Sequence, residues 1–253
     1  MNLDAADGSN MFTSSIADKI FGADSEFSGV QFHFHSGSEH TIDGKRFDLE
    51  MHTVHYPKDV ENGFIAAAMG IIFSVEEYTA NLSWSEQALI DTFFDSLKWS
   101  DMTEAGPTVD LVTYGSLMQM VDMSNRYIYK GSVTTPPCAT FVYWNVLSTV
   151  YPISAKHVAL FKKQLNRGEE GKLDEYGNFR AIQKEDEHNV IYLQSKASLD
   201  EKKGMVVAVS ILAVTTAIGI LVSVVLFCKI KKSDDDSKVN QVEMKEGGKD
   251  FQP

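Results

Sequence analysis

Residues 31–35 read Gln-Phe-His-Phe-His, so polar and aromatic side chains alternate with a period of two. Successive side chains of a β-strand point to opposite faces of its sheet. In a strand, Gln31, His33 and His35 would share one face, while Phe32 and Phe34 would pack on the other. The alternation therefore predicts a strand that carries two converging imidazoles over an apolar layer.

A second run, from Glu50 to Val54, repeats this parity with one histidine, because Glu50, His52 and Val54 fall on one face of a strand. A neighbouring antiparallel strand would bring His52 to the pair His33 and His35. Three neutral imidazoles with an open fourth position are typical of catalytic zinc sites. The two runs together predict such a site.

Gln31 and Glu50 suit partners of the ligands, because metal-bound histidines usually donate their second N–H to a carboxylate or carbonyl oxygen. A His-x-His pair alone is as often chance or a pair of packed histidines, but its combination with Glu50 and His52 favours a metal site. His55 falls on the face opposite His52 and is interpreted as a core group. Three histidines lack such company and are interpreted as structural or surface residues: His40, His157 and His188.

Strands dominate the predicted structure before residue 195. Period-2 runs at 30–35 and 47–55 lie on either side of Asp43-Gly44, a strong turn signal, and an apolar run follows at 64–75. One helix is predicted after a capping-box sequence that begins at Ser83, and another with Ser154 as its cap. We expect a mainly β fold with a few short peripheral helices, and strands and turns elsewhere.

Five motifs resemble, in combination and in order, those of the α-class carbonic anhydrases: QFHFH, GSEHT, LEMHTVH, GSVTTPPC and GNFRAIQ. The resemblance covers residues 31–183. It implies a twisted, largely antiparallel central sheet with zinc (Zn2+) at the bottom of a conical cleft. The implied reaction is the reversible hydration of carbon dioxide to bicarbonate and a proton by zinc-bound hydroxide, since zinc lowers the pKa of bound water to about 7.

The resemblance also implies a role for individual residues. His33, His35 and His52 would be the zinc ligands, Thr134 would accept a hydrogen bond from zinc-bound hydroxide, and Glu39 would accept one from Thr134. A hydroxyl that donates to a carboxylate can only accept from the nucleophile, so this relay would orient the nucleophile.

Further residues would support the ligands or meet the substrate. By the same resemblance, Tyr129 would support the Thr134 network, the backbone near Asn178 would receive the N–H of His35, and Thr135 would contact bicarbonate or inhibitors. Gln31 and Glu50 would orient His33 and His52. The residues that would line an apolar pocket for carbon dioxide, each of which alone is an ordinary core residue, are Val54, Ala68, Val133 and Trp144.

The charge of the chain argues against nucleic acid as a partner. The formal net charge is −12, and the sequence shows no basic patch of the kind that phosphate-binding surfaces need. The expected small-molecule partners are carbon dioxide and bicarbonate.

Residues 205–230 carry no charge until Lys229, and about 20 apolar residues suffice for a helix to cross the hydrocarbon core of a membrane. We interpret this segment as a single transmembrane helix, because buried core helices rarely run so long without a polar face. Residues 1–195 would form the carbonic anhydrase-like domain, 196–204 a linker and 231–253 a disordered charged tail. The lysines that flank the span slightly favour a cytoplasmic tail and an extracellular or lumenal domain.

Carbonic anhydrase domains carry more chain before their first histidine motif, including a proton-shuttling histidine that has no counterpart here. We expect the domain to be N-terminally incomplete, and Cys138 to have lost an N-terminal cysteine partner. Thr215, Gly219 and Ser223 form a small-residue stripe on which two spans could pair into a homodimer. An alternative function is a zinc-binding or interaction module without turnover, whereas a zinc hydrolase is disfavoured because the His-Glu-x-x-His helix is missing.

Overall fold

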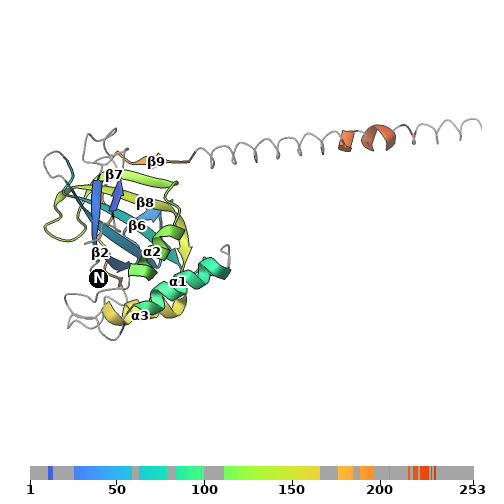
Figure 1. Cartoon of the computed structure of the whole chain (residues 1–253). Helices are drawn as coiled ribbons and strands as arrows, with labels where there is room; N and C mark the ends of the chain where they lie inside the picture. Colours follow the sequence, from blue (N-terminus) through green and yellow to red (C-terminus); the bar gives the residue numbers. More distant parts are fainter. Residues whose placement is uncertain are drawn as a thin grey trace, which may run out of the picture. The chain divides into compact units, whose positions relative to one another are not determined.

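The structure is a computed structural model that describes residues 11–13, 26–58, 63–78, 84–97, 99, 111–165, 176–184 and 189–195, together with single helical residues between 205 and 231. The chain divides into two units, Met1–Gln194 and Ser195–Pro253. In its described residues, the first unit contains a central sheet and three helices (Figure 1).

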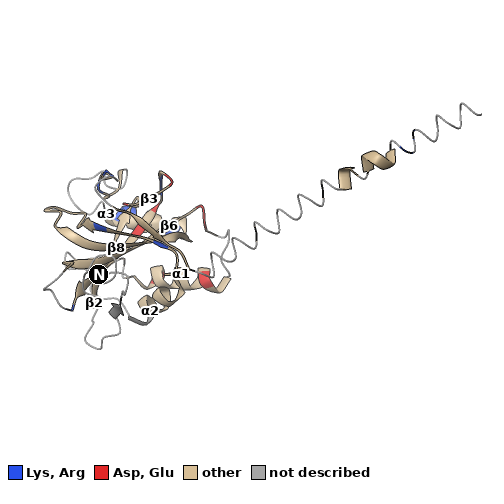
Figure 2. Cartoon of the chain, turned by 90° about the horizontal axis from the view of Figure 1, so that it is seen from above, with Lys and Arg blue, Asp and Glu red and all other residues tan. Residues whose placement is uncertain are grey.

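Seven strands form the central sheet in the order β1-β2-β5-β6-β8-β7-β9. Neighbouring strands are antiparallel except for β6 and β8, which run parallel, so the sheet is mixed but largely antiparallel, as predicted. The strands are β1 (Met11–Thr13), β2 (Glu26–Ser36), β5 (Leu49–Pro57), β6 (Ala66–Ser74), β7 (Arg126–Ser132), β8 (Thr140–Pro152) and β9 (Ile191–Leu193). Most of the sheet carries neither acidic nor basic residues (Figure 2).

A short hairpin stands outside the sheet, formed by β3 (Thr41–Ile42) and β4 (Lys45–Arg46). Its two-residue loop is the predicted Asp43-Gly44 turn, in which both residues have positive φ angles of 52° and 75°. Asparagine, aspartate and glycine are the residues that adopt this conformation most readily, which explains why the sequence signal was reliable here. The hairpin places Glu39 and His40 directly before β3.

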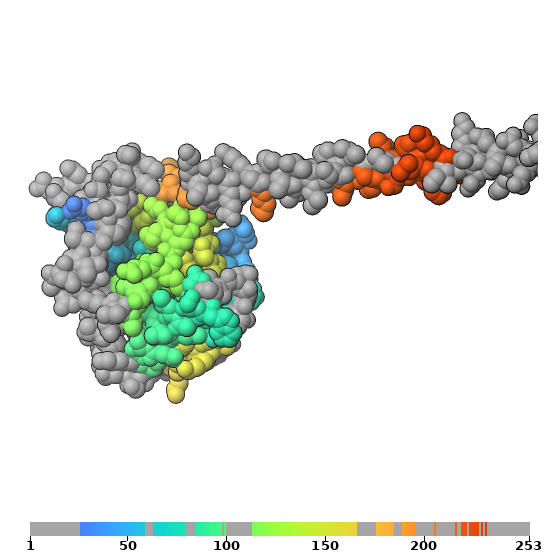
Figure 3. Space-filling view, turned by 45° about the vertical axis from the view of Figure 1, so that its right-hand side comes forward, coloured from blue at the N-terminus to red at the C-terminus, as the bar shows by residue number. Residues whose placement is uncertain are grey.

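Three helices cover one face of the sheet (Figure 1): α1 (Trp84–Ser96), α2 (Leu111–Met120) and α3 (Ala155–Leu165). Phe93 and Phe94 of α1 contact Phe32 and Phe34 of β2, so the predicted apolar layer of the histidine strand is the surface on which the helices pack. The imidazoles therefore lie on the opposite face. α1 and α2 lie side by side on the surface (Figure 3).

The two predicted helices are present. Ser154 caps α3, because its hydroxyl accepts a hydrogen bond from the backbone N–H of His157 at 3.2 Å. Ser83, the predicted start of the other capping box, lies outside the described residues.

The expectation of only strands and turns at 111–120 was wrong, since α2 forms there. Its residues Tyr114 and Leu117 are buried three positions apart, and the Tyr114 ring stacks on Phe32 at 5.4 Å. Tertiary packing overrides the weak local helix preference of this segment, which includes Gly115.

The predicted span falls largely outside the described residues. Of residues 205–230, the structure describes 205, 216, 219–221, 223–227 and 229, which are helical. In this described part, no helix is long and apolar enough to cross a membrane. The described residues also do not include the linker at 196–204, almost all of the tail at 231–253, Thr215 or His188.

Candidate metal centre

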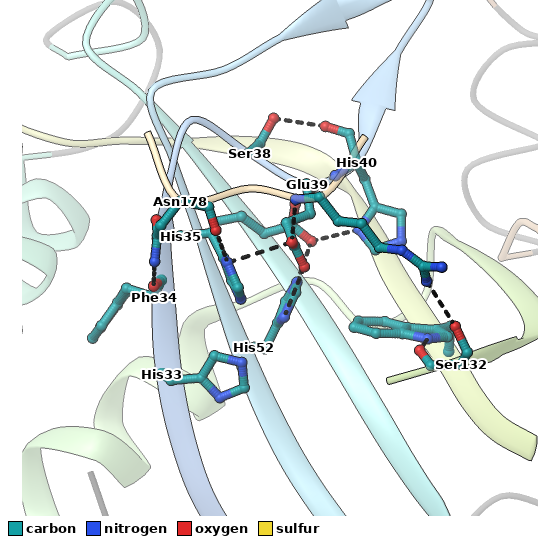
Figure 4. A network of polar contacts seen from close by, with 12 residues as sticks. His33, Phe34, His35, Ser38, Glu39, His40, His52, Ser132 and Asn178 are labelled. Carbon is teal, nitrogen blue, oxygen red and sulfur yellow. Dashed lines mark hydrogen bonds and ion pairs between the residues drawn. The ribbon is translucent and has the colours of Figure 1, made fainter. Parts of the chain in front are cut away.

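The three predicted ligands meet on the sheet face that the helices leave uncovered. His33 of β2 lies directly opposite His52 of β5 in the antiparallel register, and His35 follows two residues along β2. Their ring centroids are 5.1 Å apart for His33 and His35, 5.2 Å for His33 and His52, and 4.6 Å for His35 and His52. One nitrogen of each ring lies within 4.8 Å of the others, which is close enough to hold one metal ion (Figure 4).

One nitrogen of each imidazole is engaged, which selects the nitrogen left for a metal. His33 Nδ1 lies 3.0 Å from Gln31 Oε1, His35 Nδ1 lies 3.1 Å from the carbonyl oxygen of Asn178, and His52 Nε2 lies 2.9 Å from Glu50 Oε1. Each partner is an acceptor, so each of these nitrogens carries the proton. The lone pairs therefore sit on His33 Nε2, His35 Nε2 and His52 Nδ1.

These lone pairs fit a metal ion. His35 Nε2 is buried and has no hydrogen-bond partner, and buried polar atoms without partners are uncommon in folded proteins. A cation bound by the three free nitrogens would satisfy this atom. Neutral imidazoles with engaged second nitrogens are the donor set that zinc takes in catalytic sites.

The electrostatics of the cluster keep the ligands neutral. Burial, together with the neighbouring His52 and His35, lowers the pKa of His33 to about 3. Burial and His52 also lower the pKa of His35 from its ordinary value. A metal ion binds only deprotonated imidazole, so a lowered pKa leaves both rings ready to bind at neutral pH.

A buried chain of polar groups extends from His52 away from the cluster. Glu50 is fully buried, and its Oε1 accepts hydrogen bonds from His52 Nε2 and from His40 Nδ1 at 2.6 Å. Glu50 Oε2 accepts a further bond from the backbone N–H of His40 at 2.8 Å. The Tyr129 hydroxyl oxygen lies 2.7 Å from His40 Nε2 and extends the chain across β7.

This chain of contacts shifts two pKa values in opposite directions. Burial alone would raise the pKa of Glu50, but the adjacent His40 and His52 outweigh it and hold that pKa well below its ordinary value. Burial would likewise lower the pKa of His40, whereas the Glu50 carboxylate raises it overall. His40, Glu50 and His52 also lie close enough to hold a metal, but Glu50 Oε1 already accepts hydrogen bonds from both rings, so we assign these three residues to a hydrogen-bond network.

The interpretation of His40 as a structural or surface residue without polar partners was wrong, because it contacts both Glu50 and Tyr129. Its position in GSEHT, directly after Glu39, was the available signal. His157 is a structural residue, as interpreted, because it is buried in the first turn of α3 and contacts Ser154 and Asp95. His55 is a core residue, as interpreted, because it is buried on the face opposite His52.

An apolar row borders the imidazoles. It consists of Val54, Ala68 and Trp144, which lie opposite one another in the registers of β5, β6 and β8, and Gln31 of β2 and Tyr129 of β7 flank it at its two ends. Ala68 and Trp144 are buried, and the Trp144 ring centroid lies 4.7 Å from that of His52. The indole N–H donates to the backbone oxygen of Ser132 at 3.0 Å, which fixes the ring. The sheet therefore places an apolar surface beside the free nitrogens.

A family model for eukaryotic-type carbonic anhydrases matches residues 5–194. The chain belongs to this family. Carbonic anhydrase 6 from Mus musculus is 32% identical over 157 residues, which cover 55% of this chain and 47% of that protein. Alpha carbonic anhydrase 8 from Arabidopsis thaliana is 30% identical over 172 residues, which cover 68% of this chain and 39% of that protein. The chain thus spans about half the length of the curated carbonic anhydrases that it matches.

Two solved structures are similar to the chain. A hyperthermostable carbonic anhydrase from a hydrothermal vent chimney has a TM-score of 0.48 and 27% identity, with 67% of this chain and 65% of that chain covered. Dioscorin in complex with ascorbate has a TM-score of 0.48 and 29% identity, with 68% and 64% covered.

The carbonic anhydrase relay is not closed in this structure. Glu39 Oε1 accepts a hydrogen bond from the backbone N–H of Arg180 at 2.7 Å, and Oε2 is buried without a hydrogen-bond partner. Thr134 and Glu39 both line one cavity of about 470 Å³, but no hydrogen bond joins these two described residues. Val133 and Thr135 lie on the loop after β7 with exposed side chains. The Tyr129 hydroxyl contacts His40.

Proposed function

We propose that the chain is a zinc carbonic anhydrase that interconverts carbon dioxide with bicarbonate and a proton. The observation that carries the proposal is the convergence of three lone pairs from His33, His35 and His52, each with its second nitrogen on a separate acceptor. Family membership supports the same reaction. When bound, zinc makes a water oxygen nucleophilic near neutral pH.

The supporting residues would set the geometry of the ligands. Gln31, Glu50 and the Asn178 carbonyl each fix one ring orientation and one tautomer, which makes the imidazoles better donors. Glu50 would increase the basicity of its ligand, His52, more than the other two acceptors increase that of theirs. It is the one carboxylate among the three acceptors, and contacts with His40 and His52 keep it charged.

The apolar row would hold the substrate. Carbon dioxide has no charge and no hydrogen-bond donor, so a surface made by Val54, Ala68 and Trp144 would bind it weakly while excluding ordered water. Thr134 and Glu39 would orient the nucleophile if the Thr134 hydroxyl donated to Glu39 Oε2, which has no hydrogen-bond partner. Glu39 Oε2 is thus the atom that would accept the hydrogen bond from the Thr134 hydroxyl.

Carbon dioxide hydration by the purified full chain, measured with its zinc content, tests the proposal. Wild type should bind one zinc ion and hydrate carbon dioxide, and His52→Ala should lose both properties. His55→Gln is the matched control, because it changes a histidine of the same strand that faces the opposite side, and it should keep both. Activity that survives in zinc-free protein or in His52→Ala would contradict the assignment.

A zinc-binding module without turnover is the second candidate. The open Thr134–Glu39 relay favours it, since Glu39 Oε2 is buried without a hydrogen-bond partner. Stoichiometric zinc in wild type and its loss in His52→Ala, with no hydration in either, would select the module over the enzyme.

We also propose that residues 205–230 anchor the protein in a membrane, with the domain extracellular or lumenal. The absence of charged residues from 205 to 228 supports the anchor. Resistance of the full chain to extraction by alkaline carbonate, together with release of a chain cut before residue 205, would support it, whereas extraction of the full chain would contradict it.

A further inference from the structure

The segment 176–184 lies outside the strands, yet two of its backbone groups contact the metal centre. The Asn178 carbonyl accepts the Nδ1–H of His35 at 3.1 Å, and the Arg180 N–H donates to Glu39 Oε1 at 2.7 Å. These partners lie more than 140 positions away in sequence. The orientation of His35 and the position of Glu39 therefore depend on how this segment is fastened to the loop between β2 and β3.

Asn178 provides one fastening. Its backbone N–H donates to the Ser36 oxygen at 3.1 Å, and its side-chain oxygen accepts from the Ser36 N–H at 2.8 Å. These bonds fix the segment to the end of β2. They leave the position of the following residues, including Arg180, to other contacts.

Phe179 provides the second fastening, because its ring fills the space above two glycines. A Cβ atom on Gly37 would lie 2.6 Å from the Phe179 ring, and one on Gly177 would lie 2.8 Å from it. Both distances are shorter than real Cβ contacts, and both glycines have positive φ; at Gly177 the Ser36 backbone oxygen would also lie 2.0 Å from the Cβ, so glycine at both positions suits this packing. The guanidinium of Arg46 covers the same ring, with its Cζ 3.9 Å from the centroid.

Arg46 also contacts the loop between β2 and β3. Its Nη1 donates to the backbone oxygen of Ser38, which directly precedes Glu39. One guanidinium thus joins the loop that carries Glu39 to the segment that carries the Asn178 carbonyl and the Arg180 N–H. A planar fork that stacks and donates at once is specific to arginine, because a lysine ammonium offers only a point charge.

We propose that Arg46 is a positioning residue of the metal centre. It holds Phe179 against residues 36–40. The Asn178 carbonyl, which accepts from His35, and the Arg180 N–H, which donates to Glu39, are thereby kept in place. The inference deepens the proposed zinc function but concerns contacts that exist without the metal. Arg46 itself contacts none of the three ligands in the described structure.

The test uses the full chain with 15N-labelled histidine and reads the exchange rate of the His35 Nδ1 proton in zinc-free protein. Arg46→Lys, which keeps the charge but loses the fork, should speed this exchange tenfold or more, and so should Arg46→Gln. Phe179→Leu, which removes the flat partner of the guanidinium, should act in the same way and provides a second route if the Arg46 variants fold poorly. The backbone amides of β6 should keep wild-type exchange rates in every variant.

Lys45→Gln is the matched control for the loss of charge. Lys45 precedes Arg46 on β4, but it pairs with Glu76 on the surface at 2.5 Å. This variant should leave the His35 proton unchanged. Wild-type exchange in Arg46→Lys and Phe179→Leu would overturn the proposal, and so would a general loss of protection across β6, which would reveal a purely structural role.

Zinc release to a chelator gives a second readout. Loss of a residue that orients a metal ligand typically lowers metal affinity about 10–100-fold, so Arg46→Lys should release zinc at least tenfold faster than Lys45→Gln. Equal release rates would count against the proposal. If wild type held no zinc, the proposed function would fail, and the His35 proton would still decide whether Arg46 positions the site.

Discussion

The carboxylate of Glu50 lies against the backbone of Gly70, at a point where a Cβ atom on Gly70 would come within 2.5 Å of Glu50 Oε1. Gly70 sits opposite His52 in the register of β5 and β6, on the same face as the metal centre. A glycine in the middle of a fully buried strand is unfavourable for strand stability, since it has no side chain to pack. Here it provides the space in which Glu50 reaches His52.

Gly70→Ala should therefore displace Glu50 and weaken zinc binding. We expect a loss of about 10–100-fold in affinity, the usual effect of losing a group that orients a metal ligand. Competition with a chelator measures this. The control is Gly115→Ala on α2, where a Cβ meets nothing within 4 Å, so zinc affinity should stay unchanged. Wild-type affinity in Gly70→Ala would show that Glu50 does not act through this contact.

His40→Leu should destabilise the fold more than its partial exposure suggests. The substitution leaves the fully buried Glu50 without one of its two imidazole partners, although the backbone N–H of residue 40 and His52 remain. Removing one partner of a buried charge costs about 3–5 kcal/mol, and we expect the lower end because two donors are retained. Urea unfolding of zinc-free protein measures the change.

The comparison for that measurement is the exposed pair Lys58 and Glu26, joined at 2.7 Å with side chains 66% and 39% exposed. Lys58→Ala should change the unfolding free energy by less than about 1 kcal/mol, because water screens exposed pairs. Similar effects of Lys58→Ala and His40→Leu would contradict the importance of the buried network.

The ligand cluster could be predicted because strand parity is a local property. Alternation along 31–35 and 50–54 fixes which side chains share a face, and antiparallel pairing does the rest. The same parity placed Gln31 and Glu50 beside their histidines, in agreement with the contacts of His33 and His52. No knowledge of distant segments was needed.

Contacts between distant segments could not be read from local patterns. His40 directly precedes β3, a two-residue strand outside the central sheet, and its partner Tyr129 is 89 positions away. Nothing in the spacing of histidines shows that Tyr129 of β7 reaches His40. The positions of Asn178, Thr134 and Arg180 depend likewise on loop packing, and only the motif resemblance indicated the first two.

The stability of the zinc-free protein should fall in acid. The pKa of His33 is lowered from 6.5 to about 3 in the fold, so between these values the unfolded chain binds a proton that the folded chain does not. Unfolding then takes up a proton, and the unfolding free energy decreases as the pH falls through this window. The slope is at most about 1.4 kcal/mol per pH unit for one imidazole. Urea unfolding from about pH 8 to about pH 4 measures it.

Two variants separate the contributions to this slope. His33→Gln removes a group with a lowered pKa and should flatten the acid side of the profile. His40→Gln removes a group whose pKa is raised, and such a group loses its stabilising contribution as the pH rises through the folded-state value. His40→Gln should therefore leave the acid slope in place. A slope that His33→Gln does not change would show that His33 titrates normally in the fold.

Ala68→Leu should separate substrate binding from metal binding. Ala68 lies between Val54 and Trp144 in the register, and both Ala68 and Trp144 are almost fully buried. A larger side chain would occupy the apolar surface between Val54 and Trp144. Hydration should fall at least about tenfold, which corresponds to about 1.4 kcal/mol in the barrier, while zinc affinity stays within about twofold.

Ala88→Leu adds the same atoms to the exposed side of α1 and should change neither quantity. If Ala68→Leu lost zinc and hydration in parallel, the added atoms would have disturbed His52 itself, and the apolar row would be part of the support of the ligand. If hydration stayed unchanged with zinc retained, carbon dioxide would approach the metal from another side, and Val54, Ala68 and Trp144 would be core residues only.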